Sequence, residues 1–215
     1  MVSRQRVLRV KGLIDTPTLT WLIVASEPRE LARVARRPGW LLLASGPGSR
    51  LVSEALRDKR AVDGIVSIGF CGALDPGLEI GDIVVSGGEV ASSRHFVRGE
   101  ILSTDRVAVT AAEKRTLRER TGAIAVEMES AAVAAKAREW GVPFRCIKAV
   151  SDTASQDMPL DFNQYRDSAG QFSRSRIAAA ALRHPFTRIP ALRRLDRNCR
   201  IAAERLGDFL ADCQL

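Results

Sequence analysis

Short, almost wholly apolar runs that alternate with segments of helical periodicity place the strongest constraint on the fold of this chain. Six such runs are typical of buried β-strands, and they cover residues 20–26, 40–46, 64–69, 82–87, 123–127 and 144–152. Strands of this kind, separated by helices, are typical of mainly parallel sheets that are covered on both faces. We therefore predict an α/β fold with three layers, α/β/α, around a central mixed, mainly parallel sheet.

Residue spacing also predicts the helices between and after these strands. They are expected at 49–59, 111–120, 129–140, 168–182 and 195–212, with a proline-marked connector at 184–190 between the last two. We expect the polar helix at 111–120 to be exposed. A chain of 215 residues suits one domain. We predict a single domain over residues 20–215, preceded by a flexible basic extension over residues 1–19.

Charge and composition argue against several classes of protein. Lys and Arg number 33 against 25 Asp and Glu, a net charge of +8, but the basic residues are scattered and the few aromatic residues do not interleave with them. A base-stacking platform is therefore poorly supported, and we predict no nucleic-acid partner. No apolar run approaches the ~18 residues that span a bilayer. The basic C-terminus is compatible with an anionic membrane, but a helix packed on the sheet with its arginines outward is the favoured interpretation.

The cysteines and histidines do not form a recognisable metal motif. Cys71, Cys146, Cys199 and Cys213 form no CxxC pair, and the two histidines lie far apart in sequence. We therefore expect free buried thiols in a reducing cytoplasm and no metal site. The glycine turns match neither a GxGxxG nor a Walker motif, so no cofactor is predicted. The N-terminal segment lacks the apolar region and the cleavage site of a secretory signal.

Four glycine-rich or acidic segments come directly after predicted strands. They are Gly46-Pro47-Gly48, Gly69-Phe70-Cys71-Gly72, Glu127-Met128-Glu129 and Ser151-Asp152. In open α/β sheets, ligands bind outside the carboxyl ends of the strands. We therefore expect these segments to meet at one edge of the sheet and to form a ligand site there.

The acids in these segments each have two interpretations. Glu127 and Glu129 stand in an apolar run, where both could cap the following helix. One acid suffices for a cap, however, and a second buried carboxylate is costly unless it binds something, for which sugar hydroxyls are suitable. Asp152 is either a turn or cap residue, or a general acid whose pKa is raised in a dry pocket.

The segment Glu27-Pro28-Arg29-Glu30, after the first strand, has two interpretations as well. An acid here could activate a water molecule, while Arg29 could hold a phosphate. Alternatively, Pro28 begins a helix and its neighbours only occupy the first turn.

Together, these segments resemble the superfamily of nucleoside phosphorylases and methylthioadenosine/S-adenosylhomocysteine nucleosidases. The resemblance runs from about Trp21 to Asp152, and it rests on AIAVEMESAAVA, IKAVSDTA and SIGFCGALDPGLEIGDIVV, and more loosely on LIVASEPREL and SGPG. Within that superfamily, the short chain and its ending HPFTRIPALRRL resemble the hopanoid-associated phosphorylase group. The resemblance implies a nucleoside phosphorylase-like fold and a homo-oligomer.

The resemblance also implies cleavage of the N-glycosidic bond in a purine nucleoside of the adenosine type. In that family the second glutamate of the VEME motif, here Glu129, binds the ribose hydroxyls, Met128 packs on the sugar, and the SD aspartate, here Asp152, donates a proton towards N7 of the base. An acid after the first strand activates water in the hydrolases, and Glu30 or Glu27 would fill that place. The further substrate-binding positions that we predict are Glu127, Phe70, Cys71, Gly72, Val107 and Ser151.

Several residues depart from the pattern of the family. Phe70 stands where many relatives carry Ser, and Lys148 stands where Arg is common. Val107 replaces an aromatic residue that stacks on adenine in the nucleosidases. The segment between Gly88 and Leu102 is too short for a helix and a strand that help to close the 5′ side of the sugar pocket, so an open 5′ side could admit a bulky substituent.

Ser67 bears on the choice of nucleophile. Phosphorylases of the superfamily carry an Arg at this position, so Ser67 favours water, and hydrolysis of the methylthioadenosine/S-adenosylhomocysteine type is our main prediction. Phosphorolysis of a nucleoside with a bulky 5′ group is the alternative, because the chain offers phosphate ligands. These are Gly46, Gly48, Arg29 and Arg50. A nucleoside-binding module that has lost its chemistry is the non-enzymatic alternative.

Overall fold

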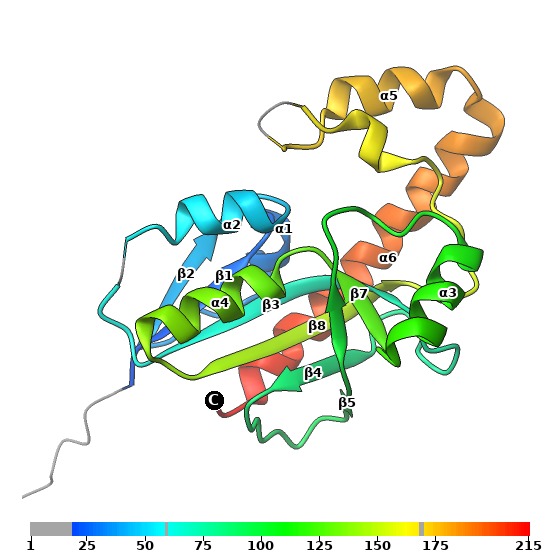
Figure 1. The fold of residues 1–215 in the computed structure, drawn as a ribbon. Helices are drawn as coiled ribbons and strands as arrows, with labels where there is room; N and C mark the ends of the chain where they lie inside the picture. The colour runs from blue at the N-terminus through cyan, green and yellow to red at the C-terminus, as the bar shows by residue number, and fades with distance from the viewer. Residues whose placement is uncertain (1–18, 59, 168–169) are drawn as a thin grey trace, which may run out of the picture.

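A computed structural model describes residues 19–58, 60–167 and 170–215. Except for Leu19, the basic extension predicted at residues 1–19 lies outside the described residues. Within them, eight strands form a single sheet (Figure 1). The strands are β1 Trp21–Ala25, β2 Trp40–Ala44, β3 Gly64–Ala73, β4 Ile83–Gly87, β5 Val97–Arg98, β6 Ile101–Ser103, β7 Ala125–Glu127 and β8 Phe144–Asp152. The helices are α1 Pro28–Leu31, α2 Ser49–Ala55, α3 Ala111–Thr121, α4 Ser130–Trp140, the 3-10 helix η1 Phe162–Tyr165, α5 Arg174–Leu182 and α6 Pro185–Asp212.

The sheet is mixed and mainly parallel, as the sequence predicts. Its strand order is β2-β1-β3-β8-β4-β5, and β6 and β7 branch from β3. Strands β2, β1, β3 and β8 run parallel to one another, whereas β4 is antiparallel to β8. Strand β7 is antiparallel to β3, with Val126 opposite Gly72, and β6 runs parallel to β7.

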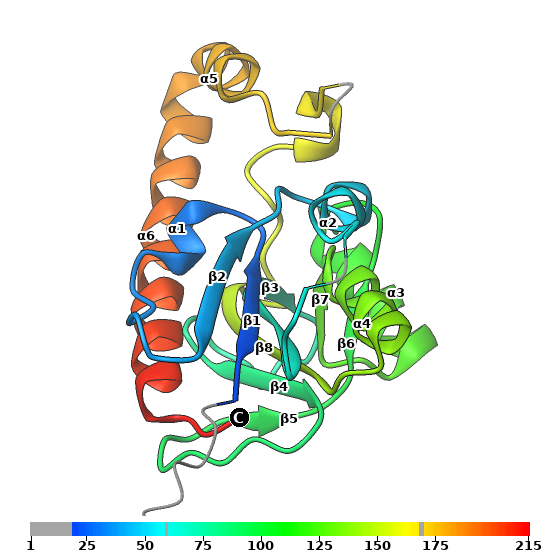
Figure 2. The same cartoon turned by 90° about the vertical axis from the view of Figure 1, so that its left-hand side faces the viewer.

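Helices cover both faces of the sheet, which gives the three predicted layers (Figure 2). Successive side chains of a strand point to opposite faces. In β1, Ile23 therefore packs in the core with Leu206 and Phe209 of α6, while Leu22 on the opposite face packs in a second core cluster. That second cluster holds Val52 of α2, Leu56 directly after it, and Val133, Ala137 and Trp140 of α4.

Several predicted boundaries are wrong. The helix predicted at 49–59 ends at Ala55, and in the helix predicted at 168–182 residues 170–173 are not helical, so that α5 begins at Arg174. The segment Gly69-Phe70-Cys71-Gly72 is not a turn after β3 but its last part, because β8 and β7 continue to pair with β3 there. The connector predicted at 184–190 is helical and forms the start of α6, with Pro185 at the first helical position and Pro190 inside the helix. Pro190 has no N–H to donate to the carbonyl of Phe186.

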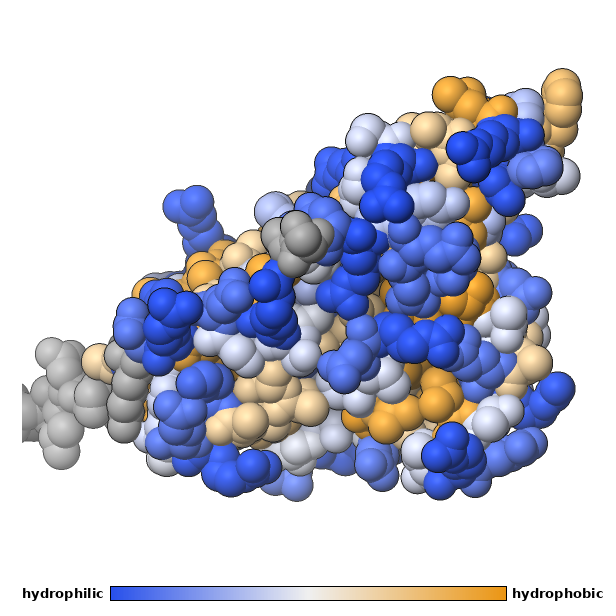
Figure 3. All heavy atoms as spheres, turned by 45° about the horizontal axis from the view of Figure 1, so that its top comes forward, coloured by the Kyte–Doolittle hydropathy of each residue, from blue (hydrophilic) through white to orange (hydrophobic). Residues whose placement is uncertain are grey.

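Helix α5 and the first turns of α6 rise above the sheet, on the side towards which β1 and β2 point (Figure 2). Seen from that side, most of the surface is hydrophilic, with apolar side chains visible at the projecting end (Figure 3). In the part of the chain that the structure describes, no helix is both long enough and apolar enough to cross a bilayer.

Candidate active site

A cavity of about 610 Å³ lies at the carboxyl ends of β1, β3 and β8. Residues from the segments 158–162 and 172–199, which include parts of α5 and α6, form its other wall. The cavity brings together most of the predicted site residues, although they come from distant parts of the sequence. Those that line it are Glu27, Arg29, Glu30, Phe70, Cys71, Gly72, Val107, Glu127, Met128, Glu129, Ser151 and Asp152.

Glu127 anchors the N-terminus of α4. Its carboxylate accepts hydrogen bonds from the N–H groups of Glu129 (3.0 Å) and Ser130 (2.9 Å) and from the Ser130 hydroxyl (2.7 Å). Burial alone would raise the pKa of this carboxyl, but the Lys148 ammonium and these hydrogen bonds hold the pKa below its ordinary value. The capping interpretation therefore applies to Glu127, whose hydrogen-bonding capacity is largely used inside the protein.

Glu129 has a different environment from Glu127. Its Oε1 accepts one hydrogen bond, from the N–H of Gly48 at 2.7 Å, and the residue is only 8% exposed. Burial raises the pKa of Glu129 to about 7; the charges of Glu127 and Glu30 add to the shift and Lys148 opposes it. Near neutral pH, this carboxyl at the cavity wall is therefore poised between its two protonation states.

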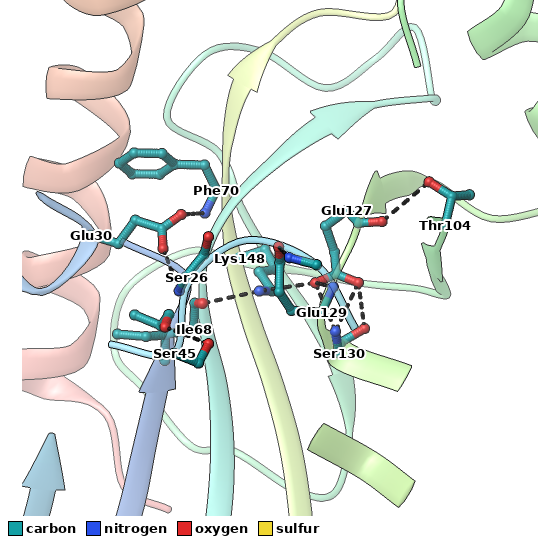
Figure 4. A network of polar contacts seen from close by, with 12 residues as sticks. Ser26, Glu30, Ser45, Ile68, Phe70, Thr104, Glu127, Glu129, Ser130 and Lys148 are labelled. Carbon is teal, nitrogen blue, oxygen red and sulfur yellow. Dashed lines mark hydrogen bonds and ion pairs between the residues drawn. The ribbon is translucent and has the colours of Figure 1, made fainter. Parts of the chain in front are cut away.

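Lys148 is the counter-charge for this group of acids. The residue is 1% exposed, and its ammonium donates to the carbonyl of Ile68 (3.0 Å) and pairs with Glu127 (3.1 Å; Figure 4). Burial alone lowers the pKa of an ammonium group, but the neighbouring acids, Glu127 foremost, raise the pKa of Lys148 well above its ordinary value. Lys148 is therefore a permanent positive charge inside the sheet.

Of the two acids that follow the first strand, Glu27 and Glu30, it is Glu30, in α1, that is buried. Its Oε2 accepts from the N–H groups of Ser26 (2.7 Å) and Glu27 (2.9 Å), and its Oε1 accepts from the N–H of Phe70 (3.1 Å). Burial raises the pKa of this carboxyl, although Lys148 and the backbone donors oppose the shift. Gly69 makes the approach possible, because its φ is +132° and a Cβ there would lie 2.7 Å from Glu30 Oε1.

Glu27 differs from Glu30 because it is partly exposed and already paired. Its carboxylate lies 2.9 Å from the guanidinium of Arg29. Both residues line the cavity, and the Arg29 guanidinium also lies 5.7 Å from the ring centre of Phe70. The hydrogen-bond donors around Glu30 fix that side chain more firmly than the single ion pair fixes Glu27.

Asp152, at the end of β8, is held by a second buried lysine. Lys114 is fully buried and lies 2.5 Å from Asp152 Oδ2, and its ammonium also donates to the carbonyls of Thr153 (2.8 Å) and Gln156 (3.1 Å). The Ser151 hydroxyl donates to Asp152 Oδ1 at 2.9 Å. A side chain at position 72 would collide with this carboxylate, because a Cβ on the glycine there would lie 2.7 Å from Oδ2.

Lys114 is the residue that the sequence analysis missed. It belongs to α3, which was expected to be exposed, and α3 is otherwise mostly exposed or half-buried. The one signal in the sequence was Leu117, which lies one turn further along the same face and packs against a buried cluster. Residues that line the cavity and were not predicted include Ser26, Thr104, Arg106, Phe162, Phe172, Ile177, Leu192 and Leu195.

The four residues predicted to bind phosphate differ in their placement relative to the cavity. The N–H of Gly46 donates to the carbonyl of Ser26 at 2.9 Å, and the N–H of Gly48 donates to Glu129. Neither glycine lines the cavity, and Arg50 does not line it either. Of the predicted phosphate ligands, only Arg29 reaches the cavity.

Among the residues that the structure describes, no group of three His, Cys, Asp or Glu side chains is arranged to hold a metal ion. All four cysteines are buried free thiols, as the sequence predicts.

Comparison with known proteins confirms the resemblance inferred from the sequence. Residues 87–183 match the model of the phosphorylase superfamily. A 5′-methylthioadenosine/S-adenosylhomocysteine nucleosidase of Shewanella halifaxensis is 35% identical over 97 residues. That alignment covers 45% of this chain and 40% of the relative, so it spans less than half of either protein.

Solved structures of nucleosidases share the fold over most of the chain. The nucleosidase of the same name from Helicobacter pylori has a TM-score of 0.64 at 15% identity, covering 90% of this chain and 97% of its own. The futalosine hydrolase of Helicobacter pylori has a TM-score of 0.63 at 16% identity, covering 90% of this chain and 96% of its own. The predicted nucleoside phosphorylase-like architecture is therefore confirmed.

Replacing Lys148 tests its part as the buried counter-charge. Lys148→Met leaves the Glu127 carboxylate buried without its ion-pair partner, so we expect the free energy of unfolding to fall by about 3 to 5 kcal/mol. Urea denaturation measures this change. Lys136→Met removes a lysine from a surface pair with Glu139 and is the matched control, for which a loss below about 1 kcal/mol is expected. Equal losses in the two variants would show that the buried position of Lys148 has no special role.

Proposed function

We propose that this chain hydrolyses the N-glycosidic bond of a purine nucleoside of the adenosine type. The observation that carries the proposal is the convergence of Glu30, Glu129 and Asp152 on one cavity, from three distant segments of the sequence. Breaking this bond builds positive charge on the ribose and negative charge on the departing base. A site for the reaction therefore needs a carboxylate near the sugar, an acid near the base and a base near a water molecule.

Glu129 is the residue that we assign to the ribose. One of its oxygens accepts from Gly48, and the other is available to accept ribose hydroxyls. Its position beside Met128, which also lines the cavity, suits a sugar that packs on the methionine side chain. The carboxylate form of Glu129 would also stabilise positive charge that develops on the sugar in the transition state.

Asp152 is the residue that we assign to protonation of the base at N7. The pair of electrons from the broken glycosidic bond moves onto the purine, and a proton at N7 makes the purine a better leaving group. Lys114 fixes Oδ2, so the proton would pass from Oδ1, whose partner is the rotatable hydroxyl of Ser151. Asp152 must carry that proton when the bond breaks.

Glu30 is better suited than Glu27 to activate water. Burial raises the pKa of Glu30, which makes its carboxylate a stronger base, and three N–H groups hold it in position. Glu27 is engaged by Arg29 and is partly exposed. The water oxygen would form the new bond to the ribose, while Glu30 takes up the proton that the water loses.

Phosphorolysis is the alternative, and the contacts of the glycine turn argue against it. The N–H groups of Gly46 and Gly48 are engaged within the protein, and Arg29 is paired with Glu27. A phosphate would have to displace these contacts. Ser67, at the position where phosphorylases carry an arginine, is 1% exposed and does not line the cavity.

The cavity also supports an apolar or bulky 5′ group on the nucleoside. Its C-terminal wall carries Phe162, Phe172, Ile177, Leu192 and Leu195, whereas Glu30, Glu129 and Asp152 come from the sheet side. Relatives and neighbours of similar fold are named for methylthioadenosine, S-adenosylhomocysteine and futalosine. We therefore propose a methylthioadenosine or S-adenosylhomocysteine type of substrate and a cytoplasmic reaction. The homo-oligomer stays a prediction.

Release of adenine without phosphate tests the choice of nucleophile. We expect the purified protein to release adenine from methylthioadenosine or S-adenosylhomocysteine in phosphate-free buffer, with free ribosyl sugar as the second product. Added phosphate should leave the rate unchanged. Chromatography of both products measures the outcome, and strict dependence on phosphate with formation of a ribose 1-phosphate would establish the phosphorylase instead.

Asp152→Asn separates an enzyme from a binding module. The amide cannot donate a proton as an acid does, so we expect kcat to fall by about 10²- to 10⁴-fold while adenosine analogues still bind. Calorimetry measures the binding and adenine release measures kcat. Asp208→Asn, at an exposed ion pair with Arg94, is the matched control and should keep wild-type activity. A wild-type protein that binds nucleosides without any turnover would support the non-catalytic module.

The raised pKa of Glu129 predicts a pH dependence. With a pKa of about 7, Glu129 is mostly protonated one unit lower, and its protonated form neither stabilises a cation nor accepts hydroxyls as well. We therefore expect kcat/KM to fall as pH drops through about 7. Glu129→Gln should be weakly active and should lack this limb of the pH profile, and an identical limb in the variant would assign the titration to another group.

A further inference from the structure

The corner between α5 and α6, residues 182–186, carries the two most exposed large apolar side chains among the described residues. Leu182, the last residue of α5, is 68% exposed, and Phe186, in the first turn of α6, is 95% exposed. Apolar side chains are visible among hydrophilic ones at this projecting end of the molecule (Figure 3). A single exposed apolar residue needs no explanation, but two of this size on one projecting corner do.

The charge around this corner has one sign. Residues 174–194 contain no Asp or Glu, and their arginines are Arg174, Arg176, Arg183, Arg188, Arg193 and Arg194. All of these except Arg188 are exposed, and Arg188 donates to the carbonyl of Ala180 at 2.8 Å. Arg174 and Arg176 lie at the far end of α5, where Arg174 lines the cavity and Arg176 donates to the carbonyl of Gln164, so Arg183, Arg193 and Arg194 are the exposed charges nearest the corner. Arg193 lies about two helical turns after Phe186, so helical periodicity places both on the same side of α6.

We propose that the α5–α6 corner docks on the surface of an anionic lipid bilayer. Apolar side chains that project from a helix insert at the boundary between headgroups and acyl chains, while arginines around them attract anionic headgroups. Leu182 and Phe186 supply the apolar part of such a contact, and the surrounding arginines supply the charge. This surface contact requires no membrane-spanning helix.

Two other kinds of partner, a second copy of this chain and a nucleic acid, fit the same corner less well. In a symmetric contact with a second copy of this chain, the corner of each copy would face that of the other, and their arginines would repel. Nucleic acid would be attracted by the arginines, but the exposed leucine and phenylalanine would have no base-stacking platform around them. An anionic bilayer satisfies both the charge and the apolar side chains.

Docking in this way would set the position of the cavity relative to the bilayer. The two helices that form the corner also supply Ile177, Leu192 and Leu195 to the wall of the cavity. The cavity would therefore lie next to the bilayer surface, on the same side of the sheet as the docked corner. The inference stands on the corner alone and does not depend on the reaction proposed above.

Sedimentation with lipid vesicles tests the proposal. The wild-type protein is expected to pellet with phosphatidylcholine vesicles that contain phosphatidylglycerol, and to stay in solution with vesicles of phosphatidylcholine alone. Leu182→Ser with Phe186→Ser should weaken binding at least about tenfold, because the apolar contact is lost. Arg183→Gln with Arg193→Gln should weaken it about fivefold for each arginine. Added salt should also weaken wild-type binding.

Matched changes elsewhere on the surface are the controls. Leu41→Ser replaces a leucine that is 44% exposed on β2, and Arg36→Gln with Arg57→Gln removes two exposed charges outside the corner. Both should bind vesicles as the wild type does, and thermal unfolding should verify that every variant folds. Equal binding by the corner variant and the wild type would overturn the proposal, as would equal binding to neutral vesicles or no binding at all.

Two further measurements would show whether a second copy of the chain or a nucleic acid binds the corner instead. Light scattering that shows a dimer lost in the Leu182→Ser, Phe186→Ser variant, with vesicle binding unchanged, would make the corner a contact between copies of the chain. Salt-sensitive binding to duplex DNA in the absence of vesicle binding would make it a nucleic-acid site. Either result would overturn the assignment to a lipid surface.

Discussion

The arrangement of acids in this protein depends on one buried ammonium group. Lys148 lies inside the sheet, 3.1 Å from Glu127, and its charge also acts on Glu129 and Glu30. Several carboxylates in one dry region would otherwise repel one another and lose their hydration. Because Lys148 sits on β8 and bonds to the carbonyl of Ile68 on β3, the charge that stabilises the acids is fixed to the two central strands.

One positive charge cannot neutralise all three acids, and the structure distributes its effect unevenly. Glu127 takes the direct ion pair and the donors of the α4 N-terminus, so its pKa is lowered, whereas the pKa values of Glu129 and Glu30 are raised by burial. Asp152 is separate from this group, because Lys114 is its partner. The two buried lysines thus serve different acids, and within the group around Lys148 the pKa of Glu127 is shifted in the opposite direction from those of Glu129 and Glu30.

Glu127, Glu129 and Asp152 could be predicted as candidates from the sequence because each stands in or at the end of an apolar run near a strand end. Glu30 could be predicted from its place in the short segment after the first strand. Their partners could not, since burial of Lys114 is decided by how α3 packs beside Asp152, and the local sequence of α3 is mostly polar, with Leu117 as its one large apolar residue. The strand pairing that places Glu127 at the site could not be predicted either. The parallel-sheet rule places strand ends at one edge, but β7 is antiparallel to β3 and reaches the site through its pairing with Gly72. Pairing between strands distant in sequence sets that geometry.

Helix α6 shows why two interpretations of the basic C-terminus need not exclude each other. From Asn198 onwards, α6 buries one face, where Leu206, Phe209 and Leu210 pack on the sheet, and there the helix with outward arginines is what the structure contains. Before Asn198, no residue of α6 is fully buried. This N-terminal part of α6 extends beyond the sheet. Its Leu192 and Leu195 line the cavity, and Phe186, in its first turn, is exposed. Amphipathic periodicity in a sequence identifies an apolar face, but only the extent of the sheet decides which part of that face the protein itself covers.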